Sequence, residues 1–173
     1  AATVESFQGL LADASPTVTL SAAGDQVMLG DTFTFTASFT NPSSQVGFAP
    51  YIDLFIPLTR KDGEGDEIDD GISFESATFL GQEIKSYTLT FDAAGNATHP
   101  LAKDASGNAV ILHAADYGMR AGDQVIVLQL PNASIVQGQP SVDIVVTLRL
   151  SSLADTSLTD SAPNLTVKAR GGF

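Results

Sequence analysis

The chain has 173 residues, 43% of them hydrophobic, and its 20 acidic and 8 basic residues give a formal net charge of −12. This size and apolar content fit one domain with a substantial core, while the negative charge excludes nucleic acid and anionic membranes as binding partners, because both attract clustered Lys and Arg. Cys is absent, which excludes zinc–thiolate sites and Cys nucleophiles, and no apolar stretch approaches the roughly 20 residues of a membrane span.

The first part of the chain predicts a change of structure near residue 17. Apolar residues at helical spacing over barely two turns predict an N-terminal connector or short helix over residues 1–16. A single β-sandwich domain is then expected over residues 17–173. Its first strands are predicted at 17–21 and 26–29, on either side of a Gly-containing turn.

Residues 32–40 read Thr-Phe-Thr-Phe-Thr-Ala-Ser-Phe-Thr, which is strict alternation over nine residues. Successive side chains of a strand point to opposite faces, so three Phe and one Ala share one face and Thr and Ser occupy the other. This pattern predicts a half-buried strand of an antiparallel sandwich.

The middle of the chain predicts a buried strand followed by a hairpin. Residues 51–56 are apolar on both faces except for Asp53, which favours a central position in a sheet. After the acidic segment 61–71, we expect a hairpin of residues 72–80 and 84–91 across the turn at 81–82.

The last third repeats turn and strand signals. Two near-copies, Asp-Ala-Ala-Gly-Asn-Ala at 92–97 and Asp-Ala-Ser-Gly-Asn-Ala at 104–109, suit a type I turn followed by a left-handed residue. Short turn-separated strands typify a two-sheet sandwich, so we predict an all-β, immunoglobulin-like or related Greek-key β-sandwich of about nine to ten antiparallel strands. The later strands are expected at 109–113, 124–130 (mid-sheet), 141–150 and 165–169.

The acidic segment 61–71 is the sharpest candidate for a ligand site. Six carboxylates crowd into nine residues beside glycines, and such oxygen ligands on a loop suit calcium. A helix-flanked calcium loop is excluded, because Glu67 stands where that motif needs Gly and Ser73 where it needs Glu. A sandwich-type calcium loop and a solvated surface loop remain as readings, and the second is favoured. The candidate calcium ligands are Asp62, Glu64, Asp66, Asp69 and Asp70.

The sequence does not assemble a catalytic motif. His99 and His113 are the only histidines, and the Gly-x-Ser-x-Gly turn of one hydrolase class is absent. Sugar-cleaving sites usually carry aromatic platforms, whereas this chain has no Trp and three Tyr. We therefore predict no catalytic residues and no enzyme. A carbohydrate-binding module stays open as an alternative, and it requires Tyr51 or Tyr117 to be exposed beside the acidic loop.

Several motifs resemble the conserved-repeat β-sandwich modules of large surface proteins of Gram-negative bacteria. A Gly-Asp opening before residues 32–40, an Asn turn after them and a hydrophobic-Pro ending of the next strand match that pattern over roughly residues 17–173. The further matching segments are Phe91–Pro100, Val127–Pro131, Leu153-Ala154-Asp155 and Ala169–Phe173.

The resemblance implies an extracellular, non-enzymatic, structural or adhesive module on a bacterial cell surface, acting by spacing, attachment or self-association. Its expected partners are neighbouring copies or other surface-protein modules, with surface carbohydrate as a further candidate and no membrane insertion. Calcium is frequent in such proteins, although no ligand set carries over. The alternative is a self-assembling subunit of a surface layer or filament, in which an exposed strand edge contacts a neighbour.

Overall fold

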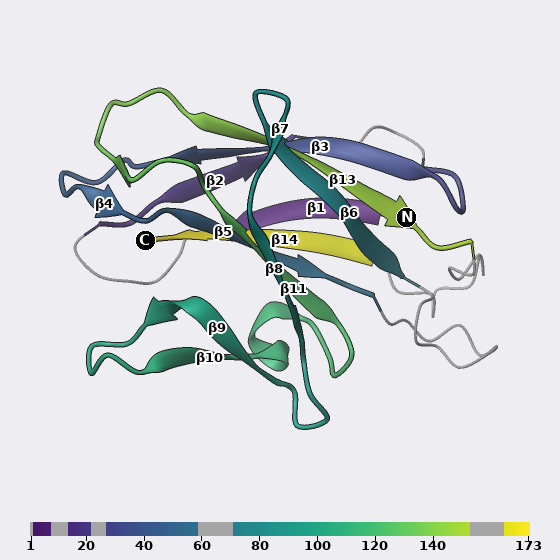
Figure 1. Cartoon of the computed structure of the whole chain (residues 1–173). Helices are drawn as coiled ribbons and strands as arrows, with labels where there is room; N and C mark the ends of the chain where they lie inside the picture. The colour runs from purple at the N-terminus through teal and green to yellow at the C-terminus, as the bar shows by residue number, and fades with distance from the viewer. Residues whose placement is uncertain (1, 8–13, 22–26, 59–70, 153–164) are drawn as a thin grey trace.

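The structure is a computed structural model that describes residues 2–7, 14–21, 27–58, 71–152 and 165–173, and its strands lie in three layers (Figure 1). The outer sheet has the order β2-β3-β13-β6-β7 and the central sheet the order β1-β14-β5-β11-β8. The third layer is the hairpin β9–β10. The predicted all-β sandwich is confirmed, and the pairing is antiparallel except between β1 and β14.

The bounds of the elements follow from their alternating sequences. The outer sheet contains β2 (Thr17–Leu20), β3 (Thr32–Thr40), β13 (Val142–Leu150), β6 (Ile72–Phe79) and β7 (Gln82–Glu83). The central sheet contains β1 (Ala2–Phe7), β14 (Leu165–Gly172), β5 (Tyr51–Ile56), β11 (Gln124–Gln129) and β8 (Ser86–Thr90). The third layer contains β9 (Asn96–Lys103), β10 (Ala109–His113) and a 3₁₀ turn (Ala114–Tyr117); β4 (Gly47–Phe48) and β12 (Ser134–Ile135) form a short ribbon.

The main core lies between the outer and central sheets. In β3, Phe33, Phe35, Ala37 and Phe39 are buried as the alternation predicted, and β13 presents its own alternating buried face beside them. Burial of apolar surface at roughly 25 cal/mol per Å² is the main stabilising contribution of such a core.

A second core lies between the central sheet and the hairpin layer, which explains why β5 is buried on both faces. Ile52, Leu54 and Ile56 face the main core, while Tyr51 and Phe55 belong to the second core. The strand β11 is divided in the same way and lies between β5 and β8. The predicted central positions of these two strands are therefore confirmed.

The expected connector or short helix at residues 1–16 is wrong for residues 2–7, which form β1. This strand pairs in parallel with β14, from Ala2 beside Leu165 to Phe7 beside Arg170. Two turns of helix are too short to be stable alone, whereas the unpaired edge of β14 offers a ladder of hydrogen bonds. Residues 8–13 lie outside the described part of the chain.

Three further expectations differ from the structure. A strand was expected at 26–29, but its described residues, 27–29, are not part of a strand. They lead into a turn in which Gly30 has φ 80°. The expected hairpin keeps only the short pair β6–β7, because the chain then crosses to the central sheet, where β8 pairs with β11. The strand β9 was not predicted, since its Pro100 argues against a central strand; it pairs only with β10, across an irregular register.

The two repeated turns have the predicted form. Oδ1 of Asp92 accepts hydrogen bonds from the backbone N–H groups of Ala94 and Asn96, and Asp104 repeats this arrangement twelve residues later. Gly95 and Gly107 hold the left-handed position, with φ of 80° and 83°.

Candidate functional site

A buried polar cluster joins the central sheet to the hairpin layer. Oδ1 of Asp53, in β5, accepts a hydrogen bond from His99 of β9 at 2.7 Å. Oδ2 of Asp53 forms an ion pair with Arg170 of β14 at 2.9 Å. Arg170 also donates to the hydroxyl of Tyr117 at 2.7 Å. The side chains of Asp53 and His99 are fully buried. We call these four residues the Asp53 cluster.

The hydrogen bonds of His99 define its tautomer. The backbone N–H groups of Leu101 and Ala102 both donate to Nδ1, at 3.1 and 2.9 Å, so Nδ1 carries no proton. The proton then resides on Nε2 and is donated to Asp53. The imidazole therefore has a fixed orientation and one proton, on Nε2. If the ring rotated or gained a second proton, an N–H group of the ring would point at the two backbone N–H donors.

Aromatic rings enclose the cluster. The ring of Tyr51 lies 4.7 Å from that of His99, and the rings of Phe55 and Tyr117 are stacked at 4.0 Å with an interplanar angle of 14°. The guanidinium of Arg170 lies 5.2 Å from the ring centroid of Tyr117, within the range of a cation–π contact. The rings of Tyr51 and Phe55 are buried, and such a low-dielectric surrounding strengthens the charge interactions beside them.

Burial and charge act on the titrating groups around Asp53. Burial raises the pKa of Tyr51 to about 12, and the charge of Asp53 acts in the same direction. Burial also raises the pKa of Tyr117, against the opposing effect of Arg170. For Arg170, burial alone would lower the pKa, but the carboxylate of Asp53 and the Tyr117 hydroxyl outweigh it and the pKa is raised. The guanidinium of Arg170 therefore stays charged and the phenols of Tyr51 and Tyr117 stay neutral at physiological pH.

This geometry supports a structural tie. Each oxygen of Asp53 has a partner, both nitrogens of His99 are engaged, and the Asp53 and His99 side chains have no exposed surface. A general base needs an open position where a substrate proton can approach. The cluster instead links four elements, β5, β9, the 3₁₀ turn and β14, and removing one partner of such a buried pair costs about 3–5 kcal/mol.

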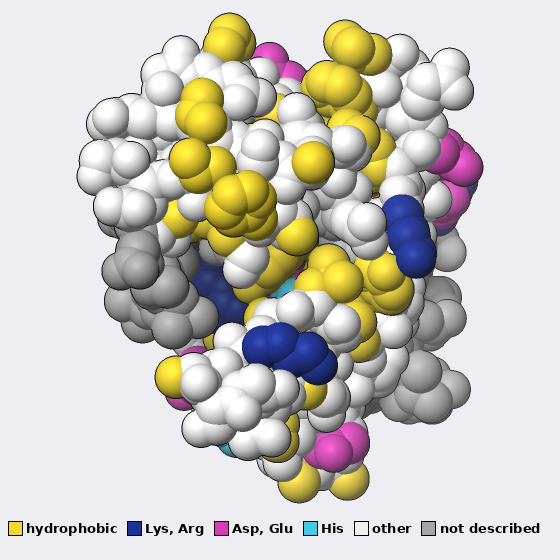
Figure 2. All heavy atoms as spheres, turned by 60° about the vertical axis from the view of Figure 1, so that its left-hand side comes forward, with side chains coloured by type: hydrophobic (Ala, Val, Ile, Leu, Met, Phe, Trp, Pro, Cys, Tyr) yellow, Lys and Arg dark blue, Asp and Glu magenta, His cyan; other side chains and the backbone are white. Residues whose placement is uncertain are grey.

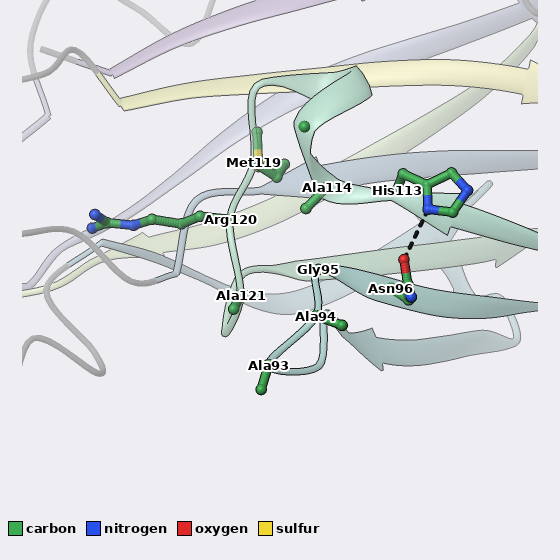
Figure 3. A pocket seen from close by; sticks show the side chains of 10 residues that line it. Ala93, Ala94, Gly95, Asn96, His113, Ala114, Met119, Arg120 and Ala121 are labelled. Carbon is green, nitrogen blue, oxygen red and sulfur yellow. Dashed lines mark hydrogen bonds between the residues drawn. The ribbon is translucent and has the colours of Figure 1, made fainter.

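A hollow of about 310 Å³ lies where the hairpin layer meets the 3₁₀ turn (Figure 3). Small side chains such as Ala94 and Ala121 line it together with Met119, and Nδ1 of His113 is 2.8 Å from Oδ1 of Asn96 at one side. Figure 3 shows the side chain of Arg120 extending away from that pair. The hollow thus has one polar pair and an otherwise mostly apolar lining.

The other residues singled out from the sequence have different outcomes. Asp62, Glu64, Asp66, Asp69 and Asp70 lie outside the described residues, so the calcium loop stays a prediction. Within the described ranges, no group of three or more His, Asp or Glu side chains is placed to hold a metal ion.

Two of the tyrosines also bear on the sequence-based alternatives. Tyr51 is 4% exposed, so it offers no platform for a sugar, and Tyr117 is partly buried and engaged with Arg170.

No helix in the described part of the chain is long and apolar enough to cross a bilayer.

The sequence patterns drew attention to Asp53, His99 and Tyr117 but not to Arg170, and they did not indicate that these residues meet. Asp53 was the one charged residue in an apolar strand, and such a residue needs a buried partner. His99 lies in the strand β9 that was not predicted, and Arg170 lies in the last strand. The odd charge within residues 51–56 was the available signal that partners must exist.

Comparisons with known proteins give no family for this chain. No protein-family model, no curated protein and no solved structure matches it.

Proposed function

We propose that this chain is a non-enzymatic, structural module of an extracellular bacterial surface protein, which spaces and attaches its neighbours. The observation that carries the proposal is the parallel pairing of β1 with β14. Ala2 lies beside Leu165, where β14 begins, while Phe173 lies beyond the end of β14. At about 3.3 Å per residue, the start of β1 and the end of the chain are roughly 26 Å apart along the strands.

This arrangement suits a module that carries tension. The start of β1 and the end of β14 lie at opposite ends of the sandwich (Figure 1). A pull on both ends draws the two strands in opposite directions along their length. The hydrogen bonds of a parallel ladder run between the strands at even spacing, so all of them bear this load together.

The Asp53 cluster reinforces the strand that bears the load. Arg170, which pairs with Phe7 in the β1–β14 register, is the residue of β14 that reaches Asp53 and Tyr117. Tension on β14 is therefore transmitted to β5 and the hairpin layer as well as to β1. The extracellular, bacterial setting rests on the resemblance of the turn and strand motifs described above.

The spacing role is tested with concatemers of two, three and four copies joined end to end. Small-angle X-ray scattering should give a maximal dimension that grows by a constant step of at least roughly 26 Å per added copy. A dimension that stays nearly constant, because successive copies fold back on one another, would rule out a spacer.

A further inference from the structure

Two loops at one end of the sandwich carry no charged residue. The loops 41–50 and 131–140 contain no Asp, Glu, Lys, Arg or His, although 16% of the whole chain is charged. At that frequency about three charges are expected in twenty residues, and interface cores are the surfaces most depleted of charge. We call these two loops the uncharged tip; they include the ribbon β4–β12.

Apolar side chains are exposed on the uncharged tip. Phe48 is 67% exposed, and Val46 and Val136 are 43% and 46% exposed. Phe48 pairs with Ser134 across the ribbon, with Val46 and Val136 next to the ribbon in sequence, so the three residues lie close together. Figure 2, which turns this end of Figure 1 forward, shows hydrophobic side chains exposed over its upper part, with acidic side chains at the top and right edges. Aromatic residues on an uncharged surface are typical of protein–protein contacts.

The uncharged tip is held in one shape by buried interactions. Asn41 is 2% exposed and donates to the carbonyls of Gln45 and Ile135, which ties the two loops together. Gln137 donates to the carbonyl of Pro42. The ring of Phe173 fills the space where Gly47 lacks a Cβ, and it packs edge-on against Phe39 at 5.4 Å. A surface that is ordered in advance loses little entropy when it binds.

We infer that the uncharged tip is a self-association surface through which two copies of this chain meet tip to tip. Each copy carries a net charge of −12, so copies repel one another wherever their charged surfaces approach. The two loops of the tip carry no charged side chain, and the first charge after the second loop in sequence is the exposed Asp143, so loop-to-loop contact brings few like charges together. The occupant of lowest electrostatic cost is therefore a second tip, related by a two-fold axis.

The charge distribution also disfavours a head-to-tail contact. The acidic segment is flanked by Leu58 and Gly71. These two flanks lie at the other end of β5 from the tip, where the backbone N–H of Gly71 donates to the carbonyl of Leu58. Six residues of strand place these flanks roughly 20 Å from the tip, and the Debye length is only about 8 Å at physiological salt. Tip-to-tip contact keeps these flanks of the two copies apart, whereas head-to-tail contact would bring the flanks of one copy to the tip of the other.

The contact is small. Four of the twenty loop residues are buried, so at most sixteen can make contact, fewer than the 20–30 per side of a standard interface, and the association falls in the weak class below about 1,200 Å². The inference rests on the proposed function in one respect: surface modules displayed at high local density can use weak contacts through multivalency.

The test is sedimentation velocity of the full chain from about 10 µM to about 1 mM, where mass action favours the dimer. Phe48→Asp and Val136→Asp should each weaken dimerisation about tenfold or more. Met28→Asp is the matched control, since Met28 is 70% exposed at the far end of β13 and the substitution changes the charge equally. Unchanged melting temperatures of all three variants ensure that folding is not the cause.

The outcomes separate the two proposals. A dimer that the tip variants abolish and Met28→Asp preserves supports the inference. A wild-type chain that stays monomeric at 1 mM overturns the inference. A series of growing oligomers that Met28→Asp abolishes also overturns it, because such a series indicates head-to-tail contact. Because the concatemer scattering measures spacing within one covalent chain, extended concatemers of a monomeric chain would leave the spacer proposal intact.

Discussion

Replacing Asp53 by Asn should destabilise the fold more than any exposed carboxylate replacement. The substitution removes the charge that faces Arg170, whose side chain is only 17% exposed. It also places an amide opposite two donors, the Nε2–H of His99 and the guanidinium, and one carboxamide oxygen cannot replace both contacts at 2.7 and 2.9 Å. His99 cannot change tautomer to help, because its Nδ1 already accepts two backbone hydrogen bonds.

The magnitude follows from the two lost charge-assisted contacts. Each hydrogen bond to a charged group contributes about 1.5–3 kcal/mol, and breaking a buried ion pair from one side costs about 3–5 kcal/mol. For a domain of this size each kcal/mol lowers the melting temperature by about 2–4 °C. We therefore expect a loss of about 3–5 kcal/mol in the free energy of unfolding and of about 6–20 °C in melting temperature.

Urea unfolding followed by circular dichroism measures the change, with hydrogen exchange to locate it. Exchange should quicken most in β9 and β10, which the cluster holds against the central sheet. Asp104→Asn is the matched control: its Oδ1 accepts two backbone N–H groups in an exposed turn, and an amide oxygen preserves them, so the expected change is within about 0.5 kcal/mol. A loss below about 1 kcal/mol for Asp53→Asn would refute the structural tie.

Three other predictions concern pH, packing and calcium. Burial raises the pKa of Tyr51 to about 12, so the folded chain keeps a proton that the unfolded chain releases near pH 10. The free energy of unfolding should therefore be unaffected by this group below pH 10 and fall by about 2–3 kcal/mol between pH 10 and 12. Alkaline unfolding curves of Tyr51→Phe should lack this fall. A Cβ at Gly172 would lie 2.2 Å from the buried ring of Tyr51, so Gly172→Ala should cost about 1–3 kcal/mol in urea unfolding. An unchanged free energy of unfolding would contradict this close approach. If the acidic segment 61–71 is a solvated loop, excess calcium should raise the melting temperature no more than excess magnesium does. A rise that is specific for calcium and that disappears in the Asp66→Asn variant would show instead that the segment binds calcium.

The sandwich strands were predictable because each carries its own signal. Strict alternation in 32–40 and 141–150 marks one buried face, and the continuous apolar run at 51–56 marks two. The failures arise where pairing across long distances decides the structure. Residues 2–7 have weak local preference, and β14, more than 150 residues away, makes them a strand. Residues 84–91 have strand character but no local signal for the sheet that they join.

The Asp53 cluster illustrates the same limit at the level of a site. Asp53 and His99 are 46 residues apart, and Arg170 lies 117 residues from Asp53. An Asp within an apolar strand predicts that a partner exists, because an unpaired buried charge is too costly. Nothing local identifies the partner, since the fold of the hairpin layer brings His99 into place.

The most direct test of the load-bearing role is single-molecule force spectroscopy with two pulling directions. The chain has no Cys, so introduced Cys residues give unique attachment points. In one variant the handles are at Ala2 and Phe173, which loads the β1–β14 ladder in shear. In the other they are at Leu80, in the turn between β6 and β7, and at Phe173, which peels the β6–β7 pair from β13 one hydrogen bond at a time. The account predicts a clearly higher unfolding force for the first pair of handles. Equal forces in both directions, or a lower force for the first pair, would contradict it.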